Sequence, residues 1–156
     1  MRDRAFLDPW EPVRPDSFFT LEAQQHGLAR LREAEDLVDF GIFAEAGDQL
    51  VGRIQLSGIS PAPFQNAHLG YFVSERHNGH GYATAAVRLA VDVAFGELVL
   101  HRVQAAVIPG NVASIRVLEK TGFREEGLAR RYLQIAGIWQ DHKLYALTAE
   151  EWPPRA

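Results

Sequence analysis

Apolar residues in the first third of the chain recur at a helical spacing and then change to a strand-like spacing. Intervals of three and seven residues within 18–31 predict a helix that begins at Asp16 or Ser17. The apolar positions that share this spacing are Phe18, Leu21, Leu28 and Leu31. Three prolines within residues 1–16 predict an irregular or extended segment before this helix.

Three strand-like runs follow the predicted helix. Residues 37–45 and 49–59 are mostly apolar, and the Ala-Gly-Asp stretch between them predicts a hairpin turn. Residues 61–66 contain two prolines and predict a loop. Residues 67–75 predict a third strand, so this part of the chain is expected to form three antiparallel strands.

The next two elements are predicted to be a helix and a buried strand. A stripe of alanine and valine predicts a helix over Thr84–Phe95. Residues 101–109 alternate only weakly between apolar and polar, which is typical of a strand that is buried on both faces beside a parallel neighbour. We interpret His101, at the start of that strand, as structural.

The last part of the chain predicts one more helix and a hairpin. Asn111 is a suitable N-cap for a helix over 112–121, and Gly122 followed by Phe123 is a typical helix end. Residues 132–147 predict two strands around a turn at Gly137. The order of elements predicts an α/β (α+β) fold with a mixed sheet, formed as one domain over residues 1–156.

Composition excludes several classes of protein. Among 156 residues, 47% are hydrophobic and 23% are charged, which is typical of a globular domain. No apolar run approaches the ~20 residues that span a bilayer, and the N-terminus has no signal-peptide core, so we expect a cytoplasmic protein without membrane contact. A net charge of −4 argues against a nucleic-acid partner bound through a basic face.

The absence of cysteine excludes disulfides, thiolate metal sites and a cysteine nucleophile. His77 and His80 are close in sequence, but no carboxylate follows at ligand spacing. We therefore expect no metal site. His142 is interpreted as structural, paired with Asp141 or a neighbour on its strand.

The candidate chemistry is concentrated in residues 76–86, a glycine-rich stretch before a helix that we call the glycine loop. Unpaired N–H groups at a helix start bind anions. A Walker A loop is excluded because no lysine follows either glycine. A dinucleotide fingerprint fits poorly, because Thr84 stands at the last small apolar position and no acidic ribose ligand follows a second parallel strand. Two interpretations of this stretch remain. One is the pattern R-x-x-G-x-G/A, formed by Arg76, Gly79 and Gly81, and the other is a glycine-rich turn that binds no ligand.

That pattern resembles the pyrophosphate loop of the GNAT N-acetyltransferases, and the resemblance extends along nearly the whole chain. The stretches that carry it are FLDPWEPVRPDSF at 6–18, Asn111-x-x-Ser114, VLEKTGF at 117–123, EGLARRYLQIAG at 126–137 and WQDH at 139–142. Within that family, they are most similar to the ribosomal-protein alanine N-acetyltransferase branch (RimJ/RimL-like).

The resemblance implies a GNAT fold in which acetyl-CoA lies in a wedge between the strands at 67–75 and 101–109. The residues it implies for binding acetyl-CoA are Phe72, Val73, Arg76, His77, Asn78, Gly79, His80, Gly81, Tyr82, Ala83, Thr84 and Asn111. Asn111 is either a helix N-cap or a residue that contacts the co-substrate, and both roles are compatible. Ser114 is either the general acid for the departing thiolate or a first-turn serine that satisfies the backbone.

The general base has no sequence signature. Glu75, His68, Asp141 and Tyr132 are close to the motifs in sequence, but an ordered water is an equally good candidate. The implied reaction is direct acetyl transfer to a primary amine, with a protein N-terminus as the expected acceptor. The alternatives are a small-molecule amine (an antibiotic, polyamine or amino acid), a non-catalytic acyl-CoA-binding module and, least favoured, a nucleotide-binding protein.

Aromatic residues near the N-terminus and in the 61–66 loop are candidates for covering the acceptor site. They are Trp10, Phe18, Phe19 and Phe64, and a core role is the alternative, above all for Phe18 or Phe19. Members of the family begin with an additional strand and helix before the segment that matches 6–18. We therefore expect an exposed sheet edge in this chain, or a homodimer that covers it.

Overall fold

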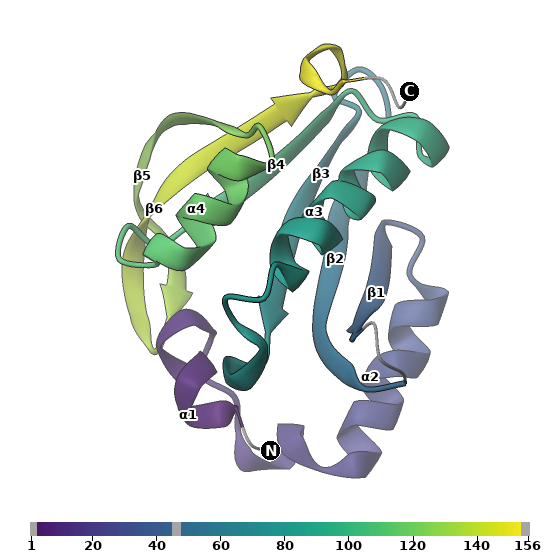
Figure 1. The fold of residues 1–156 in the computed structure, drawn as a ribbon. Helices are drawn as coiled ribbons and strands as arrows, with labels where there is room; N and C mark the ends of the chain where they lie inside the picture. The colour runs from purple at the N-terminus through teal and green to yellow at the C-terminus, as the bar shows by residue number, and fades with distance from the viewer. Residues whose placement is uncertain (1–2, 45–47, 154–156) are drawn as a thin grey trace.

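A six-stranded mixed sheet forms the centre of the protein in a computed structural model, which describes residues 3–44 and 48–153 (Figure 1). The strands are β1 (Leu37–Phe43), β2 (Leu50–Ser60), β3 (Asn66–Val73), β4 (Arg102–Val107), β5 (Arg124–Ile135) and β6 (Ile138–Thr148). Their order is β1-β2-β3-β4-β6-β5, and only the β3–β4 pair is parallel. The predicted α/β fold with a mixed sheet is confirmed.

Two helices cover one face of this sheet, the face turned toward the viewer in Figure 1. Helix α3 (Tyr82–Asp92) continues into a π-helical turn (Val93–Glu97), and α4 is Val112–Lys120. Small and branched residues of α3 are buried against the strands, with Val87 and Val91 fully buried. Leu118 of α4 joins the same core. Both helices lie where they were predicted, to within a few residues.

The N-terminal segment differs from its prediction. Within the described part of residues 1–16, α1 (Arg4–Leu7) and a 3₁₀ turn (Asp8–Trp10) replace the expected irregular chain. Proline lies in the first turn of that 3₁₀ segment, where its missing N–H leaves no hydrogen bond unmade. The guanidinium of Arg4 donates to the carboxylate of Asp16 over 2.9 Å. This hydrogen bond links α1 to the end of the N-terminal segment.

The predicted helix start at Asp16 or Ser17 is wrong. Residues Asp16–Phe19 form a separate 3₁₀ turn, and α2 runs over Leu21–Glu33. Thr20 between them is extended, and its hydroxyl accepts a hydrogen bond from the Ala23 N–H at 3.2 Å. An N-cap threonine therefore starts the helix later than the apolar spacing indicates.

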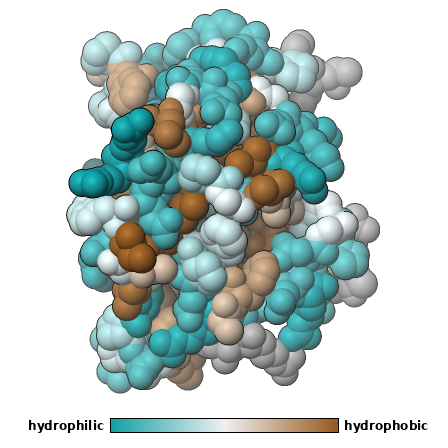
Figure 2. Space-filling model, turned by 90° about the vertical axis from the view of Figure 1, so that its left-hand side faces the viewer, coloured by the Kyte–Doolittle hydropathy of each residue, from teal (hydrophilic) through white to brown (hydrophobic). Residues whose placement is uncertain are grey.

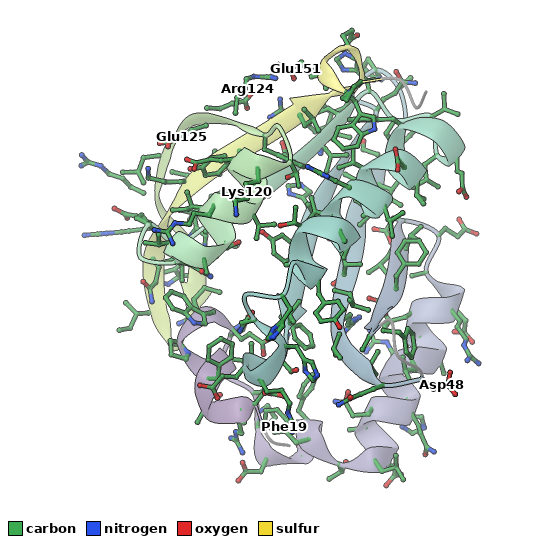
Figure 3. All side chains as sticks on the ribbon, in the orientation of Figure 1. Phe19, Asp48, Lys120, Arg124, Glu125 and Glu151 are labelled. Carbon is green, nitrogen blue, oxygen red and sulfur yellow. The ribbon has the colours of Figure 1, made fainter. Side chains whose placement is uncertain are left out.

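The final hairpin is longer than predicted. Strand β5 begins at Arg124 rather than at 132, because register shifts near Gly127 and after Ala129 let a strongly bent strand stay paired with β6. Ala136 and Gly137 form the turn with φ values of +50° and +79°, so the predicted turn at Gly137 is confirmed. At the other end of the hairpin, Arg124 and Glu151 form an ion pair (Figure 3).

The edges and surface of the sheet are only partly apolar. Strand β1 is one outer strand, and the adjacent Phe43 and Leu50 are 56% and 61% exposed. The predicted turn between β1 and β2 falls mainly on residues 45–47, outside the described residues, and a homodimer stays a prediction. Figure 2 shows separate hydrophobic patches among hydrophilic residues on another face. Within the described residues, no helix is long and apolar enough to cross a membrane.

Candidate active site

The parallel strands β3 and β4 separate soon after they begin. They are paired only from Asn66–His68 to Arg102–Gln104, although β3 continues to Val73 and β4 to Val107. The predicted wedge between these strands is therefore present in the backbone. A cavity of about 330 Å³, which we call the wedge cavity, occupies the opening.

The wedge cavity is lined from both faces of the sheet. Tyr71 of β3 points to the face that carries α3 and α4, because it contacts Ser114 of α4. Side chains alternate along a strand, so Phe72 points to the opposite face, which we call the rear face. Arg53 is paired with Phe72 in register and shares that rear face. Since all four residues line the wedge cavity, the cavity passes through the sheet.

The glycine loop lies beside this opening, and its last residues form the first turn of α3. Gly79 and Gly81 have φ values of +78° and +84°, which a residue with a Cβ adopts only with strain. A Cβ added at either position would meet nothing within 4 Å, so open space lies in front of both glycines. Gly81 gives α3 no side-chain cap, and the first N–H groups of α3 remain available to an anion.

Most residues that the sequence predicted for acetyl-CoA binding lie in this one region. Phe72 and Val73 end the separated part of β3, and the glycine loop follows after Ser74 and Glu75. A smaller cavity of about 130 Å³ joins the two, and its lining includes Asn78, Ala83 and Asn111. The other predicted residues belong to the glycine loop but line neither cavity; they are Arg76, His77, Gly79, His80, Gly81, Tyr82 and Thr84.

The two loop histidines are held by the loop itself. The ring Nδ1 of His77 lies 2.6 Å from the hydroxyl of Ser74. The Nδ1 of His80 lies 2.9 Å from the backbone carbonyl of Asn78. Both contacts join residues within or next to the glycine loop, and both rings also lie beside the Tyr82 ring. No group of three or more potential metal ligands gathers in the described residues.

Asn111 and Ser114 are joined through the start of α4. The side-chain oxygen of Asn111 accepts the Ser114 N–H at 3.1 Å, which confirms the predicted N-cap. The Ser114 hydroxyl lies 2.9 Å from the Tyr71 hydroxyl, which also donates to the Ser114 carbonyl over 3.2 Å. Burial raises the pKa of Tyr71 to about 12, so the phenol keeps its proton at neutral pH. Asn111, Ser114 and Tyr71 all line the wedge cavity.

A second group of polar residues in the wedge cavity had no sequence signature. Glu11 and Arg14 come from the N-terminal segment, and Arg53 comes from β2. Burial raises the pKa of Glu11, although the nearby positive charge of Arg14 acts against that shift. Arg53 donates to the Asp39 carboxylate over 2.5 Å, and the Arg14 guanidinium lies 4.8 Å from the centre of the Phe18 ring.

These residues lie on segments that are far apart in sequence, so spacing along the chain does not bring them together. The Glu11 carbonyl accepts the Ala136 N–H at 2.9 Å and so ties the N-terminal segment to the turn of the β5–β6 hairpin. The resemblance of residues 6–18 to the family was the one indication in the sequence that this segment matters. It did not indicate a role for the charged residues of the segment.

His142 was interpreted as structural, and its contacts agree with a strand-neighbour partner. Its Nδ1 lies 3.0 Å from the Gln140 carbonyl, and its ring centre lies 5.7 Å from that of Tyr132. Asp141, the other expected partner, instead accepts the Arg131 N–H at 2.9 Å. The sequence interpretation missed that His142 also lines the wedge cavity.

The earlier candidates for a general base lie outside the wedge cavity. The four residues are Glu75, His68, Asp141 and Tyr132, and none of them lines it. His68 instead contacts the Gln104 amide over 3.0 Å, where β3 and β4 are still paired. Of the predicted aromatic cover, Trp10 lines the cavity, while Phe18, Phe19 and Phe64 do not.

Comparisons with known proteins give one consistent result. A family model described as an acetyltransferase (GNAT) domain matches residues 3–124. The probable N-acetyltransferase YjcK of Bacillus subtilis (strain 168) is 42% identical over 148 residues, covering 93% of this chain and 82% of that relative. The ribosomal protein uS5-alanine N-acetyltransferase of Escherichia coli (strain K12) is 33% identical over 155 residues, covering 97% and 80%.

A solved structure agrees with these relatives. Mycobacterium smegmatis RimJ in complex with CoA-disulfide superposes with a TM-score of 0.92 at 35% identity, covering 97% of this chain and 75% of that chain. A mixed sheet that opens beside a glycine-rich helix start thus defines an N-acetyltransferase as the class of protein. The chain belongs to the GNAT acetyltransferase family. The resemblance inferred from the motifs is confirmed.

Proposed function

We propose that this enzyme transfers an acetyl group directly from acetyl-CoA to the N-terminal amine of a protein. The observation that carries the proposal is the wedge cavity, which passes through the sheet beside the glycine loop. A donor entering from the helix-bearing face and an acceptor entering from the rear face would meet inside it.

The residues of the donor side fit acetyl-CoA. The separated end of β3 has backbone groups near Phe72 and Val73 that are free to bind the pantetheine amides, since β4 is no longer paired there. The open space in front of Gly79 and Gly81 would leave room for a pyrophosphate, which the N–H groups at the start of α3 would bind. Arg76, His77 and His80 would add side-chain donors around it.

The chemistry assigned to this site needs few reactive side chains, because the thioester is already activated. The acceptor nitrogen forms a bond to the acetyl carbon, and the carbon–sulfur bond breaks with its electron pair leaving on sulfur. Ser114 is our candidate for returning a proton to that sulfur, because its hydroxyl is held in the cavity by Tyr71. Asn111 holds the start of α4 in place beside it.

The charges of the wedge cavity favour a peptide N-terminus over a polyamine. Within the described residues, Glu11 is the one carboxylate that lines the cavity, together with two arginines, Arg14 and Arg53. A polyamine would bring several positive charges close to these guanidinium groups. A peptide N-terminus brings one ammonium group, which suits Glu11, and backbone carbonyls, which suit the arginines.

The test is an acetylation assay with a panel of amines. Purified protein is titrated with acetyl-CoA by calorimetry, and release of free CoA thiol is then followed with N-terminal peptides, an amino acid and spermidine. We expect acetyl-CoA to bind and the peptides to be acetylated with the highest kcat/KM. Preference for spermidine would overturn the acceptor assignment. Binding without turnover on any amine would favour an acyl-CoA-binding module, and absence of binding would contradict both.

The role of Ser114 is tested by Ser114→Ala. We expect kcat to fall roughly a hundredfold, at the lower end of the range for loss of general acid catalysis. Acetyl-CoA affinity should stay near its original value, because Tyr71 retains the Ser114 carbonyl as a hydrogen-bond acceptor. Ser57→Ala, a serine of β2 outside the wedge cavity, is the matched control. An unchanged kcat in Ser114→Ala would leave Ser114 as a structural residue only.

A further inference from the structure

His142 is a buried titratable residue that faces the wedge cavity from the rear face of the sheet. Val107 of β4 is paired with Lys143 of β6, and Val107 packs toward α3 and α4 with the core. Alternation along β6 therefore places His142 on the opposite face. The residue is only 3% exposed, yet it lines the cavity. The small exposed part of the His142 ring is therefore reached through the wedge cavity, at the proposed acceptor site.

The hydrogen bond of His142 determines which nitrogen can accept a proton. Its Nδ1 lies 3.0 Å from the backbone carbonyl of Gln140. A carbonyl only accepts hydrogen bonds, so Nδ1 carries the hydrogen in this contact. In the neutral ring, Nε2 then holds a lone pair, and within the described chain no hydrogen-bond donor to Nε2 is present. A backbone carbonyl that orients an imidazole in this way is a common arrangement for a general base.

Glu11 lines the same cavity, and the charge of its ionised carboxylate is opposite to that of an ammonium group. Its backbone is fixed to the β5–β6 turn through the Ala136 N–H, so the N-terminal segment and β6 are held together beside the cavity. Partial burial makes its carboxylate costly to keep ionised without a partner, and the pKa of Glu11 is raised accordingly. An arriving ammonium would supply that partner.

We propose that the acceptor's ammonium is held by Glu11 and gives its proton to Nε2 of His142. The proposal rests on the acetyl transfer proposed above and adds the residue that prepares the amine. His142 is then a catalytic residue, whereas Glu11 acts by binding the acceptor. His142 thus replaces the four general-base candidates suggested by sequence, which lie outside the cavity.

The proton balance of the reaction closes with these groups. One proton passes from the ammonium to Nε2, and the freed lone pair on nitrogen forms the bond to the acetyl carbon. The carbon–sulfur bond breaks, and its electron pair leaves on the CoA sulfur. A second proton from the nitrogen neutralises that thiolate, by way of Ser114 in the scheme above. The proton on His142 returns to solvent through the cavity, so one proton is released per amide formed.

The decisive experiment compares His142→Asn with the original enzyme at several pH values. Asparagine can keep the hydrogen bond to the Gln140 carbonyl but has no basic nitrogen. We expect kcat/KM for peptide amines to fall roughly a hundredfold at neutral pH, within the usual range for general base catalysis. The remaining rate should rise with pH as the acceptor amine loses its proton in solution. The titratable and charged groups that face this site and can contribute to the pH profile are Glu11, Arg14, Arg53, Tyr71 and Tyr132.

A weakly basic acceptor separates a chemical role from a structural one. An amine that is already unprotonated at the assay pH needs no base for its first step, so the deficit of His142→Asn should shrink severalfold or more with it. A merely structural defect would lower both rates equally, and that result would overturn the proposal. If His142→Asn fails to fold, His142→Ala supplemented with imidazole replaces it, and recovery of rate with imidazole is expected. Absence of recovery in folded His142→Ala would also overturn the proposal.

Two controls keep this proposal distinct from the proposed function. His68→Asn changes another histidine, which contacts Gln104 outside the wedge cavity, and should retain the original rate. Glu11→Gln should raise the acceptor KM severalfold and change kcat little, and an unchanged KM would remove Glu11 from the site. A wild-type rate in His142→Asn would refute the base while leaving acetyl transfer intact. An inactive wild-type enzyme would instead refute the proposed function.

Discussion

The two sides of the wedge cavity are built in different ways. On the donor side, the end of β3, the glycine loop and the start of α3 form one continuous stretch over residues 72–86. On the rear side, the polar groups come from the N-terminal segment, β2 and β6. The donor side offers mainly backbone N–H groups, whereas the rear side offers mainly side chains.

This difference teaches what each side can recognise. Backbone groups at a helix start bind a phosphate whatever the neighbouring side chains are, provided that glycine permits the conformation. Side chains that come from separate segments can be substituted one at a time without disturbing the glycine loop. We therefore expect donor-side changes to act on acetyl-CoA affinity, and rear-side changes to act on the acceptor and on stability.

Among the variants that test this comparison through acetyl-CoA affinity or stability, Gly81→Val on the donor side should have the largest effect. A branched side chain would occupy the space in front of the loop and strain a backbone with φ of +84°. We expect acetyl-CoA to bind at least about tenfold more weakly, a loss of about 1.4 kcal/mol, as measured by calorimetry. Gly122→Val is the matched control, because Gly122 has φ of +90° but lies at the end of α4. Equal losses of affinity in both variants would refute the pyrophosphate assignment.

An intermediate effect is expected at Asn111, where two roles overlap. Asn111→Ala removes the cap of α4 and should lower the free energy of unfolding by about 1 kcal/mol, as measured by denaturant titration. Asn111→Ser keeps a neutral capping side chain and should stay within a few tenths of a kcal/mol of the original protein.

The same pair of variants also tests the contact with acetyl-CoA. If the Asn111 amide touches the donor, both variants should bind acetyl-CoA severalfold more weakly. If only the cap matters, Asn111→Ser should bind as the original protein does.

The smallest effect should be the pH dependence of stability due to Glu11. Burial raises the pKa of Glu11 in the folded protein above that of the unfolded chain, so the folded state favours the neutral carboxyl. Its contribution to stability is complete below the unfolded pKa and is lost as pH rises through the folded pKa. Glu11→Gln removes this loss, and its Tm at neutral pH should equal or exceed that of the original by up to about 2 °C.

That small difference should vanish near about pH 4, where the carboxyl of the original protein is largely protonated. Thermal melts of both proteins at the two pH values measure it. A Glu11→Gln protein that is clearly less stable at neutral pH would show that Glu11 is ion-paired in the free protein. The rear side would then not be prepared for an arriving ammonium.

Local features of the fold were predictable because their signals are local. Asn111 and Gly122 mark the two ends of α4 by capping and by a positive φ, and both were predicted. Gly137 marked the final turn for the same reason. The start of α2 was placed wrongly, because apolar spacing continued through a 3₁₀ turn that Thr20 separates from the helix. The early start of β5 was missed because its bulges interrupt the alternation of the strand.

The sequence by itself determined the glycine loop at the start of α3, the family and the order of the main elements, since each depends on residues that are neighbours along the chain. Only the tertiary structure decided which side chains meet at the rear face. His142 and Glu11 are separated by most of the chain, and they line one cavity because β6 pairs with β4 and the N-terminal segment bonds to the β5–β6 turn. Strand pairing and long-range packing determine which side chains meet there, and the spacing of residues along the sequence does not indicate it.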